Sequence, residues 1–248
     1  MKQIIQVEGI VLKTADYKEQ AVIATVLTKE GTKNYIIRAA KKISSGTRLL
    51  SIPLSKILFN ATHTDGLDTI TEGIVINTYN NLKNDINKIM VSYAILEKIM
   101  IFSKQVTDPE TFYTFVINIL DKLSTNINEE LLLTIFDLKL TYLIGIAPEV
   151  KNCLVCGTKS NHQYFSIYHG GIRCDRCGGK ESFDLNDSET KTLQLLYLVK
   201  LDKIDNKFIN VVKDDIPKIS SVIDLYYQKH LDFKSKVKQV KQSISKDS

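Results

Sequence analysis

The stretch KNCLVCGTKSNHQYFSIYHGGIRCDRCGG, residues 151–179, contains every cysteine of the chain, arranged as C-x2-C-x17-C-x2-C. Two residues between paired cysteines allow both sulfurs to approach one ion from a tight turn. Four thiolates then supply the closed tetrahedral shell that zinc takes in structural sites. Glycines follow the second cysteine of each pair, where the chain folds back past the metal. The spacing predicts a zinc ribbon with one structural Zn²⁺ per chain, and its ligands are Cys153, Cys156, Cys174 and Cys177.

The alternatives are disulfides or unrelated thiols. A cytoplasmic compartment disfavours disulfides, and chance does not place all cysteines in two equally spaced pairs. His162 and His169 lie between the pairs and could ligate, but with four cysteines available we interpret them as loop residues. A catalytic zinc keeps one coordination position open, whereas four cysteines close the shell, so we expect the ion to stabilise the fold.

The segment between the cysteine pairs reads as a small hairpin, over residues 163–168 and 171–173. A module of about thirty residues cannot bury enough apolar area to be stable alone. We therefore expect the metal to supply folding energy.

The composition is that of a soluble globular protein, with 248 residues, 44% of them hydrophobic and 25% charged. No apolar run approaches the ~18 residues that cross a bilayer. Near the N-terminus, Glu8 interrupts the apolar run that a signal peptide needs, so we expect a cytoplasmic protein. The net charge of +5 permits attraction to phosphates without demonstrating it.

Short β-branched runs separated by turn-forming residues dominate the first part of the chain. Five strands are expected, at residues 4–14, 21–28, 33–39, 50–60 and 69–78. This pattern favours a small closed barrel of the OB type over residues 1–80, with an SH3-like barrel or a small sandwich as alternatives.

From Asn81 onward the apolar residues recur at intervals of three and four, which indicates helices. Helices are expected at residues 81–100, 108–124, 128–144, 187–200 and 217–231. The lysine-rich tail, residues 234–248, is expected to be a frayed helix end or disordered. The fold class is therefore α+β and multi-domain: an OB-type barrel, then a helical domain over residues 81–248 with the zinc ribbon inserted at about residues 150–180.

A basic stretch without carboxylates runs from Gly31 to Thr64 in the predicted barrel. OB folds hold single-stranded nucleic acid with a cationic groove and a few stacking rings. The candidate phosphate contacts are Lys13, Arg38, Lys41, Lys42 and Arg48. Tyr35 is the stacking candidate. The alternative is a solvated surface in a lysine-rich protein.

Enzyme motifs are missing from the sequence. It contains no G-x-x-x-x-G-K-[ST], no G-x-S-x-G and no HExxH, and its histidines are scattered. We therefore expect no nucleotide hydrolysis by the P-loop route.

Several longer stretches carry a resemblance to a known family. They are EGIVLKTADYKEQAVIATVLTKEGTKNYIIRAAKK (8–42), LDTITEGIVINTYNNLKNDINKIMVSYAILEKI (67–99), FDLKLTYLIGIAPEVKNCLVCG (136–157) and YYQKHLDFKSK (226–236). In this order they resemble the RecO family of bacterial recombination mediators. Residues 38–42 stand at that family's basic K-G-A-R-R position and residues 47–49 at its S-R-L. Ala39 replaces the usual glycine and Thr47 the serine, while the charges are kept.

The resemblance implies a nonenzymatic, cytoplasmic, nucleoid-associated bacterial protein. It would bind single- and double-stranded DNA, promote strand annealing and, with RecR, help to load RecA onto strands coated by single-stranded DNA-binding protein. The family binds the tail of that coating protein in a groove of the helical domain. Zinc in the family is implied to be architectural.

Two other classes of function stay open on the residues alone. The first is a zinc-ribbon adaptor that joins proteins and does not bind nucleic acid. The second is a metal-dependent hydrolase acting on nucleotides, which requires an open coordination site on the metal.

Overall fold

A computed structural model describes residues 4–63, 66–125, 127–178 and 183–244. The chain divides into two compact units, residues 1–120 and 121–248, which are described separately below. A domain boundary at residue 80 stays a prediction. Among the described residues, no helix combines the length and the apolar character that crossing a membrane requires.

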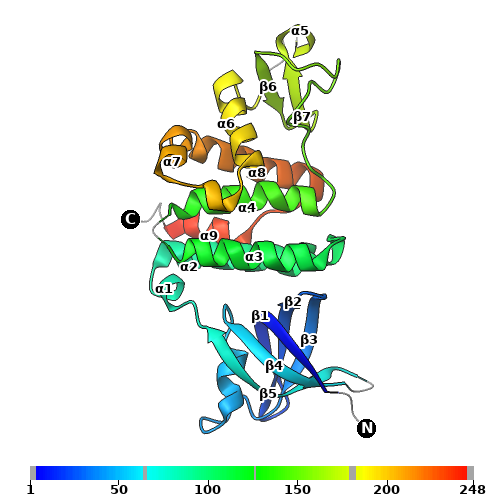
Figure 1. Cartoon of the computed structure of the whole chain (residues 1–248), viewed down its shortest axis with the longest axis vertical. Coiled ribbons are helices and arrows are strands. Elements are labelled where there is room, and N and C mark those ends of the chain that lie inside the picture. Colours follow the sequence, from blue (N-terminus) through cyan, green and yellow to red (C-terminus); the bar gives the residue numbers. More distant parts are fainter. Residues whose placement is uncertain (1–3, 64–65, 126, 179–182, 245–248) are drawn as a thin grey trace. The chain divides into compact units, whose positions relative to one another are not determined.

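The first unit begins with a closed barrel in the order β1-β2-β3-β5-β4 (Figure 1). Its strands are β1 (Ile4–Tyr17), β2 (Ala21–Thr28), β3 (Gly31–Ile37), β4 (Lys56–Thr62) and β5 (Asp68–Asn77). All neighbours are antiparallel except β3 and β5, which pair in parallel at residues 35–37 and 68–70. This topology confirms the OB-type prediction.

Alternating side chains of the strands fill the barrel. Val11, Val26, Ile37 and Ile57 are fully buried in this cluster, as expected for a small barrel whose interior is packed with side chains. A Cβ on Gly73 would lie 2.6 Å from the carbonyl oxygen of Leu58. Only glycine therefore allows β5 to approach β4 this closely.

The segment before β4 differs from the prediction. Residues 50–60 were expected to form one strand, but η1 (Gly46–Ser51) is a 3-10 helix and β4 begins only at Lys56. The side chain of Ser45 accepts a hydrogen bond from the Thr47 N–H, which caps the start of η1. Leu50, an apparent strand residue, is the side chain that η1 buries in the barrel cluster.

Helices follow the barrel. They are α1 (Asn80–Lys83), α2 (Ile86–Phe102), the 3-10 turn η2 (Ser103–Gln105) and α3 (Pro109–Leu123). The prediction of one helix over residues 81–100 was wrong, because Asp85 accepts hydrogen bonds from the N–H groups of Asn87 and Lys88 and starts a new helix there. The predicted start at residues 108–109 is confirmed, since Asp108 caps α3 by accepting from Thr111 N–H.

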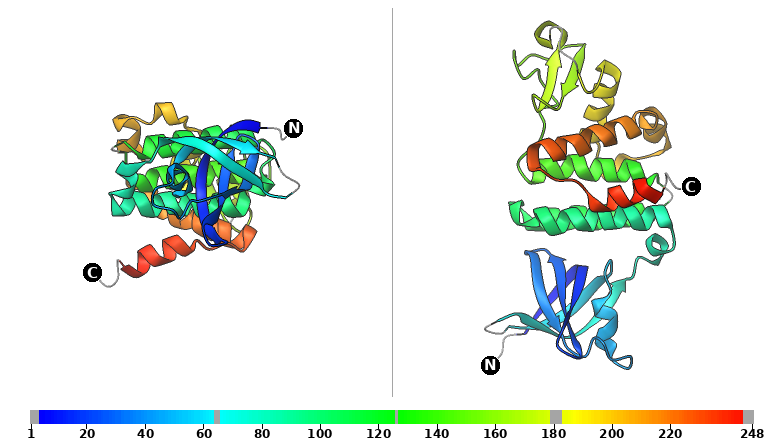
Figure 2. Two further views of the ribbon diagram at one scale, coloured as in Figure 1. Left: turned by 90° about the horizontal axis from the view of Figure 1, so that it is seen from below. Right: turned by 180° about the vertical axis from the view of Figure 1, so that it is seen from behind.

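The second unit is built around α4 (Glu129–Leu143), in which residues 131–138 are all buried. The other helices are α6 (Asp187–Leu198), α7 (Asn206–Val212), α8 (Ile216–Leu231) and α9 (Lys236–Ile244), with the turn η3 (Leu201–Lys203). Helices α4 (green) and α8 (orange) pack side by side, as both Figure 1 and the right-hand view of Figure 2 show. The hydroxyl of Tyr227 on α8 donates to the carbonyl oxygen of Asp137 across this contact.

The expected helices at residues 128–144, 187–200 and 217–231 are confirmed, but α7 was missed. Asn186 caps α6, in a capping box with Glu189. In the tail, α9 forms where a frayed end or disorder was expected. The last four residues, 245–248, lie outside the described part of the chain.

The cysteine-rich segment forms a small hairpin, as predicted. It consists of β6 (Gln163–Ser166), β7 (Gly171–Cys174) and the short helix α5 (Asp175–Gly178). Bridges between Glu149 and Gly171 and between Phe165 and Leu185 join the hairpin to the chain that enters and leaves it.

Candidate metal centre and nucleic-acid interface

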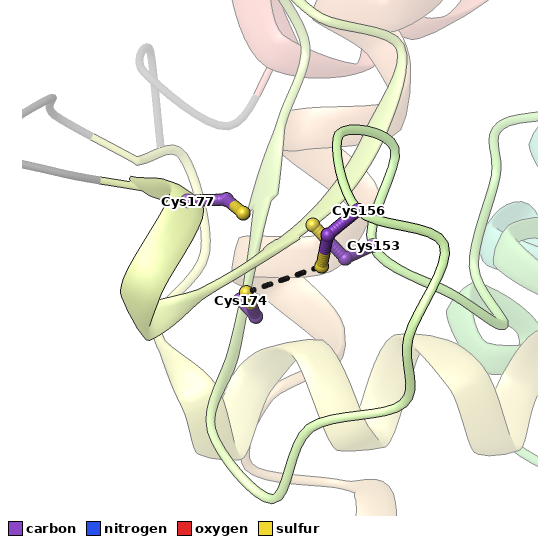
Figure 3. A group of neighbouring side chains, drawn as sticks. All are labelled: Cys153, Cys156, Cys174 and Cys177. Carbon is purple, nitrogen blue, oxygen red and sulfur yellow. Dashed lines mark hydrogen bonds between the residues drawn. The ribbon is translucent and has the colours of Figure 1, made fainter.

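The four cysteines converge on one point of the hairpin. Their sulfur atoms all lie within 4.8 Å of one another, and Figure 3 shows them turned toward a common centre. The Sγ atoms of Cys156 and Cys174 are 3.8 Å apart. Zn–S bonds of about 2.3 Å in a tetrahedron require sulfur separations of about 3.8 Å. The cluster therefore fits a metal ion of the size of zinc.

Backbone geometry positions the first cysteine pair. Gly157 has φ +69° and its N–H donates to the carbonyl oxygen of Cys153 over 2.8 Å, which closes the turn around the site. Leu154, inside the turn, donates its N–H to the carbonyl oxygen of Ile172 on β7, over 2.9 Å. The two cysteine pairs are thus held together by backbone hydrogen bonds as well as by any shared metal.

A close glycine contact positions the second pair. Cys174 ends β7, and Cys177 lies in α5. A Cβ on Gly178 would lie 2.5 Å from Cζ of Phe183, so a larger residue there would displace the Phe183 ring. Gly179, the other glycine expected here, lies outside the described residues.

The thiols have divergent acidities. Burial works to raise the pKa of Cys153, but backbone N–H groups of Cys156, Cys174 and Val155 outweigh it and lower that pKa to about 6. Hydrogen bonds with the thiols of Cys174 and Cys156 raise the pKa of Cys177 to about 12. Four thiolates this close repel one another. The charge of a bound divalent cation offsets that repulsion and favours the deprotonated form of the thiols that ligate it.

The two histidines of the segment do not join the cluster. The described residues contain one group suited to a metal, and it consists of the four cysteines alone. Nδ1 of His162 lies 3.7 Å from the carboxylate of Asp187, and His169 contacts Ser166 and Arg173. Their interpretation as residues outside the metal shell agrees with these contacts.

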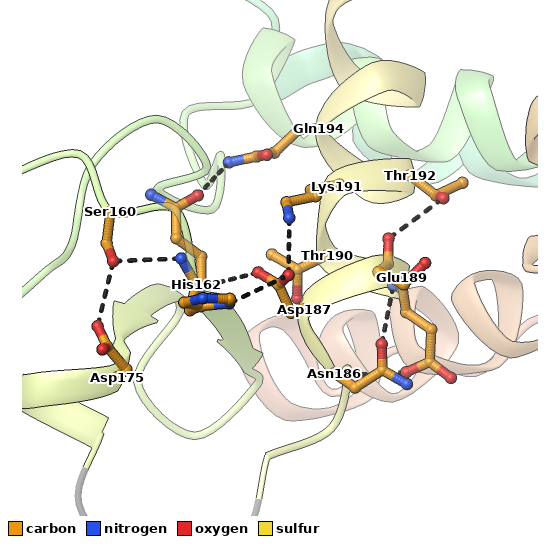
Figure 4. Close-up of polar contacts among 12 residues, drawn as sticks. Ser160, His162, Asp175, Asn186, Asp187, Glu189, Thr190, Lys191, Thr192 and Gln194 are labelled. Carbon is orange, nitrogen blue, oxygen red and sulfur yellow. Dashed lines mark hydrogen bonds and ion pairs between the residues drawn. The ribbon is translucent and has the colours of Figure 1, made fainter.

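Polar contacts fix the hairpin to α6 (Figure 4). Asp187 accepts from the backbone N–H of Gln163 over 2.8 Å, and Thr190 Oγ1 accepts from Phe165 N–H over 3.1 Å. A hydrogen bond from Lys191 keeps the pKa of the Asp187 carboxyl low, so it is ionised as an acceptor. These hydrogen bonds therefore connect the hairpin that carries the cysteine cluster to α6.

The candidate phosphate contacts lie on the barrel. Lys13 is exposed on β1, opposite Thr25 of β2. The others follow β3 or lie in η1, on a turn-rich segment that we call the basic loop, residues 38–48. Hydrogen bonds from Lys42 N–H to Ala39, and from Thr47 Oγ1 to the carbonyl oxygen of Arg38, order this loop.

The charges on the basic loop differ in their partners. Lys41 forms an ion pair of 3.0 Å with Asp16. Arg38, Lys42 and Arg48 are exposed and form no ion pair within the described part of the chain. Two other lysines of the barrel are neutralised locally, since Lys33 pairs with Glu30 and Lys56 pairs with Glu8. Arg38, Lys42 and Arg48 thus carry unneutralised positive charge on the described part of the barrel, as does Lys13 on β1.

The expectation that Tyr35 stacks on a base was wrong. Its side chain is only 1% exposed, and its ring packs against Phe59 inside the barrel at a centroid distance of 5.0 Å. Burial, with the charges of Asp68 and Glu30, raises the pKa of Tyr35 to about 12. A base cannot reach this ring, because strand alternation places residue 35 on the inward face.

Lys18 was missed from the sequence. It lies exposed in the turn between β1 and β2, two residues before Gln20, whose carbonyl oxygen accepts from Lys41 N–H over 3.4 Å. Lys18 could have been predicted from the pairing of residues 17 and 21, because the tight turn between them lies at the same end of the barrel as the basic loop.

Comparison with known proteins identifies the family. The family described as "Recombination protein O N terminal" matches residues 1–79, and "Recombination protein O C terminal" matches residues 83–239. The chain belongs to the RecO family. Curated RecO relatives include "DNA repair protein RecO" of Listeria monocytogenes serotype 4a, 27% identical over 232 residues, which cover 90% of this chain and 88% of the relative. The relative of the same name in Bacillus subtilis is 26% identical over 226 residues, with the same coverages, and that of Bacillus pumilus is 28% identical over 232 residues, covering 92% and 89%.

Ala39 stands where the basic RecO pattern usually has glycine. Its φ is +55°, in the left-handed region that glycine adopts without strain. The glycine of the basic RecO pattern therefore fits the backbone of this turn, and alanine adopts the same conformation here at a cost.

Proposed function

We propose that this RecO-family protein acts in DNA repair and homologous recombination as a nonenzymatic mediator. It binds single- and double-stranded DNA, promotes strand annealing and, with RecR, helps to load RecA onto strands coated by single-stranded DNA-binding protein. The DNA-binding domain is residues 1–80, and the protein works in the cytoplasm, at the nucleoid. The names of the curated relatives support the repair role.

The observation that carries DNA binding is the set of unneutralised cations on the basic loop. Arg38, Lys42 and Arg48 are exposed, and none of them is paired with a carboxylate in the described residues. Phosphates compete poorly for a lysine that already has a carboxylate, as Lys33 has, but they meet no such competition here. Arginine is also the side chain whose planar fork best matches phosphate oxygens.

The metal is proposed to be one Zn²⁺ per chain with a structural role. A shell of four cysteines leaves no position for a water molecule, so it supplies no hydrolytic centre. The hairpin is small, with two strands of 4 residues each, and a tetrahedral metal site would supply folding energy to so short a module.

Salt-dependent titration tests DNA binding. The affinity of the full chain for a labelled single-stranded oligonucleotide is measured at several salt concentrations, for the wild type and for Lys41→Gln/Lys42→Gln. Each lost phosphate contact flattens the log–log slope by about 0.7. Because Lys41 is already paired with Asp16, we expect a decrease of about 0.7 in the double variant, from the loss of Lys42. Lys33→Gln is the matched control, since Lys33 is already paired and its loss should leave the slope unchanged.

An unchanged slope in the double variant removes both lysines from the site. A wild-type chain that does not bind oligonucleotides at low salt favours the adaptor instead, in which the ribbon only joins proteins. Metal analysis that finds fewer than four thiolate ligands would favour the alternative of a metal-dependent hydrolase.

A further inference from the structure

The turn of the β6–β7 hairpin presents the ring of Tyr168 to solvent. This side chain is 75% exposed, which makes it the most exposed tyrosine among the described residues. An exposed ring at a loop tip usually loses order, yet here the residues on both sides of it are fixed. Ile167 is 7% exposed, and its N–H donates to the Asp184 carboxylate over 2.7 Å.

The far side of the turn is equally fixed. Gly170 has φ +75°, and its N–H donates to the carbonyl oxygen of Ser166 over 3.0 Å. Nε2 of His230, at the end of α8, contacts the carbonyl oxygen of Ile167 at 3.2 Å, and the His230 ring lies tilted against that of Tyr226 at a centroid distance of 4.2 Å. The turn is therefore anchored both to the hairpin and to α8, so Tyr168 is held rather than free.

One cation lies against the ring, and a second lies behind its neighbour His169. Nζ of Lys229 on α8 lies 4.3 Å from the centroid of the Tyr168 ring. Arg173 on β7 lies 3.2 Å from Nε2 of His169, and the His169 ring meets Tyr168 edge-on at 5.1 Å. The carboxylate that this turn does contact, Asp184, is engaged by the Ile167 N–H.

We propose that Tyr168, His169, Arg173 and Lys229 form a second nucleic-acid contact, on the hairpin of the second unit, in which a base of a single strand stacks on Tyr168. Stacking on a fixed aromatic ring is independent of sequence, because every base has a π face. Lys229 covers part of one ring face, which leaves the other face for the base, and Lys229 meets an adjoining phosphate, while Arg173 positions His169 beside the ring. This inference rests on the proposed DNA binding of the chain, and it adds a contact outside the barrel.

A structural explanation exists for Lys229, since cations near a helix C-terminus offset the helix dipole. It does not explain the exposed ring. Substitutions that keep or remove only the ring therefore separate the two roles.

The test uses the full chain and a labelled oligothymidylate, with affinity measured by fluorescence anisotropy. Tyr168→Ala should weaken binding on the order of tenfold, the effect of losing one stacked base. Tyr168→Phe keeps the ring and should bind as the wild type does. Tyr142→Ala is the matched control, because Tyr142 is 67% exposed on α4 and lies outside the cluster. Equal affinity of Tyr168→Ala and wild type would overturn the inference.

A second measurement covers the case in which Tyr168→Ala loses its metal or its fold. The wild-type chain is photo-crosslinked to an oligonucleotide carrying 5-iododeoxyuridine, and the adducts are mapped after trypsin digestion. An adduct on the peptide of residues 160–173 supports the contact, and adducts confined to the barrel contradict it.

The two proposals fail in different ways. If the barrel variants weaken binding and Tyr168→Ala does not, only the hairpin contact is refuted. A wild type that binds no oligonucleotide sinks the proposed function itself, and the hairpin contact with it.

Discussion

Lys238 of α9 reaches into the second unit and lies 3.5 Å from the carboxylate of Asp137 on α4, a residue that is 1% exposed. The same ammonium group is 2.7 Å from Asp224 on α8. A buried carboxylate is strongly destabilising when its cation is removed. The short terminal helix is therefore attached by an interaction on which the interior of this unit depends.

Loss of that cation should destabilise the fold. Lys238→Met is expected to lower the free energy of unfolding by about 3 kcal/mol, because Asp137 is left as a buried charge. Urea denaturation measures it, with Lys218→Met, an exposed lysine of α8, as the control. Adding Asp137→Asn to Lys238→Met should recover part of the loss. A Lys238→Met variant as stable as the control would show that α9 is not attached in this way.

The same ion pair predicts a pH dependence at the alkaline end. Burial works to lower the pKa of Lys238, but the attraction and hydrogen bonds of Asp137 and Asp224 outweigh it, so the pKa lies above 10.5. A raised lysine pKa stabilises the fold fully below the unfolded-state pKa, and this stability is lost as the pH rises through the folded-state pKa. The difference in stability between wild type and Lys238→Met should be constant near neutrality and shrink above pH 10.5. Melting curves from pH 7 to 11.5 test this, and a difference that grows with pH would refute it.

The metal cluster predicts a selective effect of cysteine replacement. Cys156→Ser removes one of four ligands and should release the metal, whose binding contributes apparent folding energy on the order of 10 kcal/mol in small zinc modules. Hydrogen exchange should then accelerate in residues 150–178, and bound zinc should fall below one per chain. Lys159→Ala, a neighbouring exposed residue, serves as the control. Unchanged zinc content in Cys156→Ser would exclude the four-sulfur shell.

The turn at Ala39 predicts a stabilising substitution. Ala39→Gly removes the strain of a non-glycine residue at a φ of +55°. The greater entropy of glycine in the unfolded state offsets part of this, so we expect the free energy of unfolding to rise by about 0.5 kcal/mol. Ala40→Gly is the control, since Ala40 is buried, is not among the positive-φ residues, and should lose stability. Urea unfolding of both variants gives the comparison. Destabilisation by Ala39→Gly equal to that by Ala40→Gly would contradict the strained turn.

The sequence was most informative where local chemistry determines structure. The cysteine spacing predicted both the hairpin and the convergence of four sulfurs, because tight turns with glycine leave few other geometries. Caps such as Asp108 fixed helix starts for the same reason. Strand periodicity predicted the barrel, and the observed topology closes it.

Predictions failed where distant contacts decide the outcome. Leu50 looks like a strand residue, but it is the buried residue of a 3-10 helix. Tyr35 looks like a surface ring beside cations, but the register of β3 turns it into the core. The buried partner of Lys238, Asp137, lies 101 residues away, so composition alone could only describe the tail as charged.

The central claim is that the unneutralised cations of the barrel bind nucleic-acid strands, and direct titration tests it. The full chain is titrated into a labelled single-stranded oligonucleotide in dilute buffer, beside a variant in which Arg38, Lys42 and Arg48 are all replaced by glutamine. We predict binding by the wild type that weakens steeply with salt, and a variant that loses most of that affinity while keeping its zinc and its melting temperature. Equal binding by the two proteins, or no binding by either, would contradict the account.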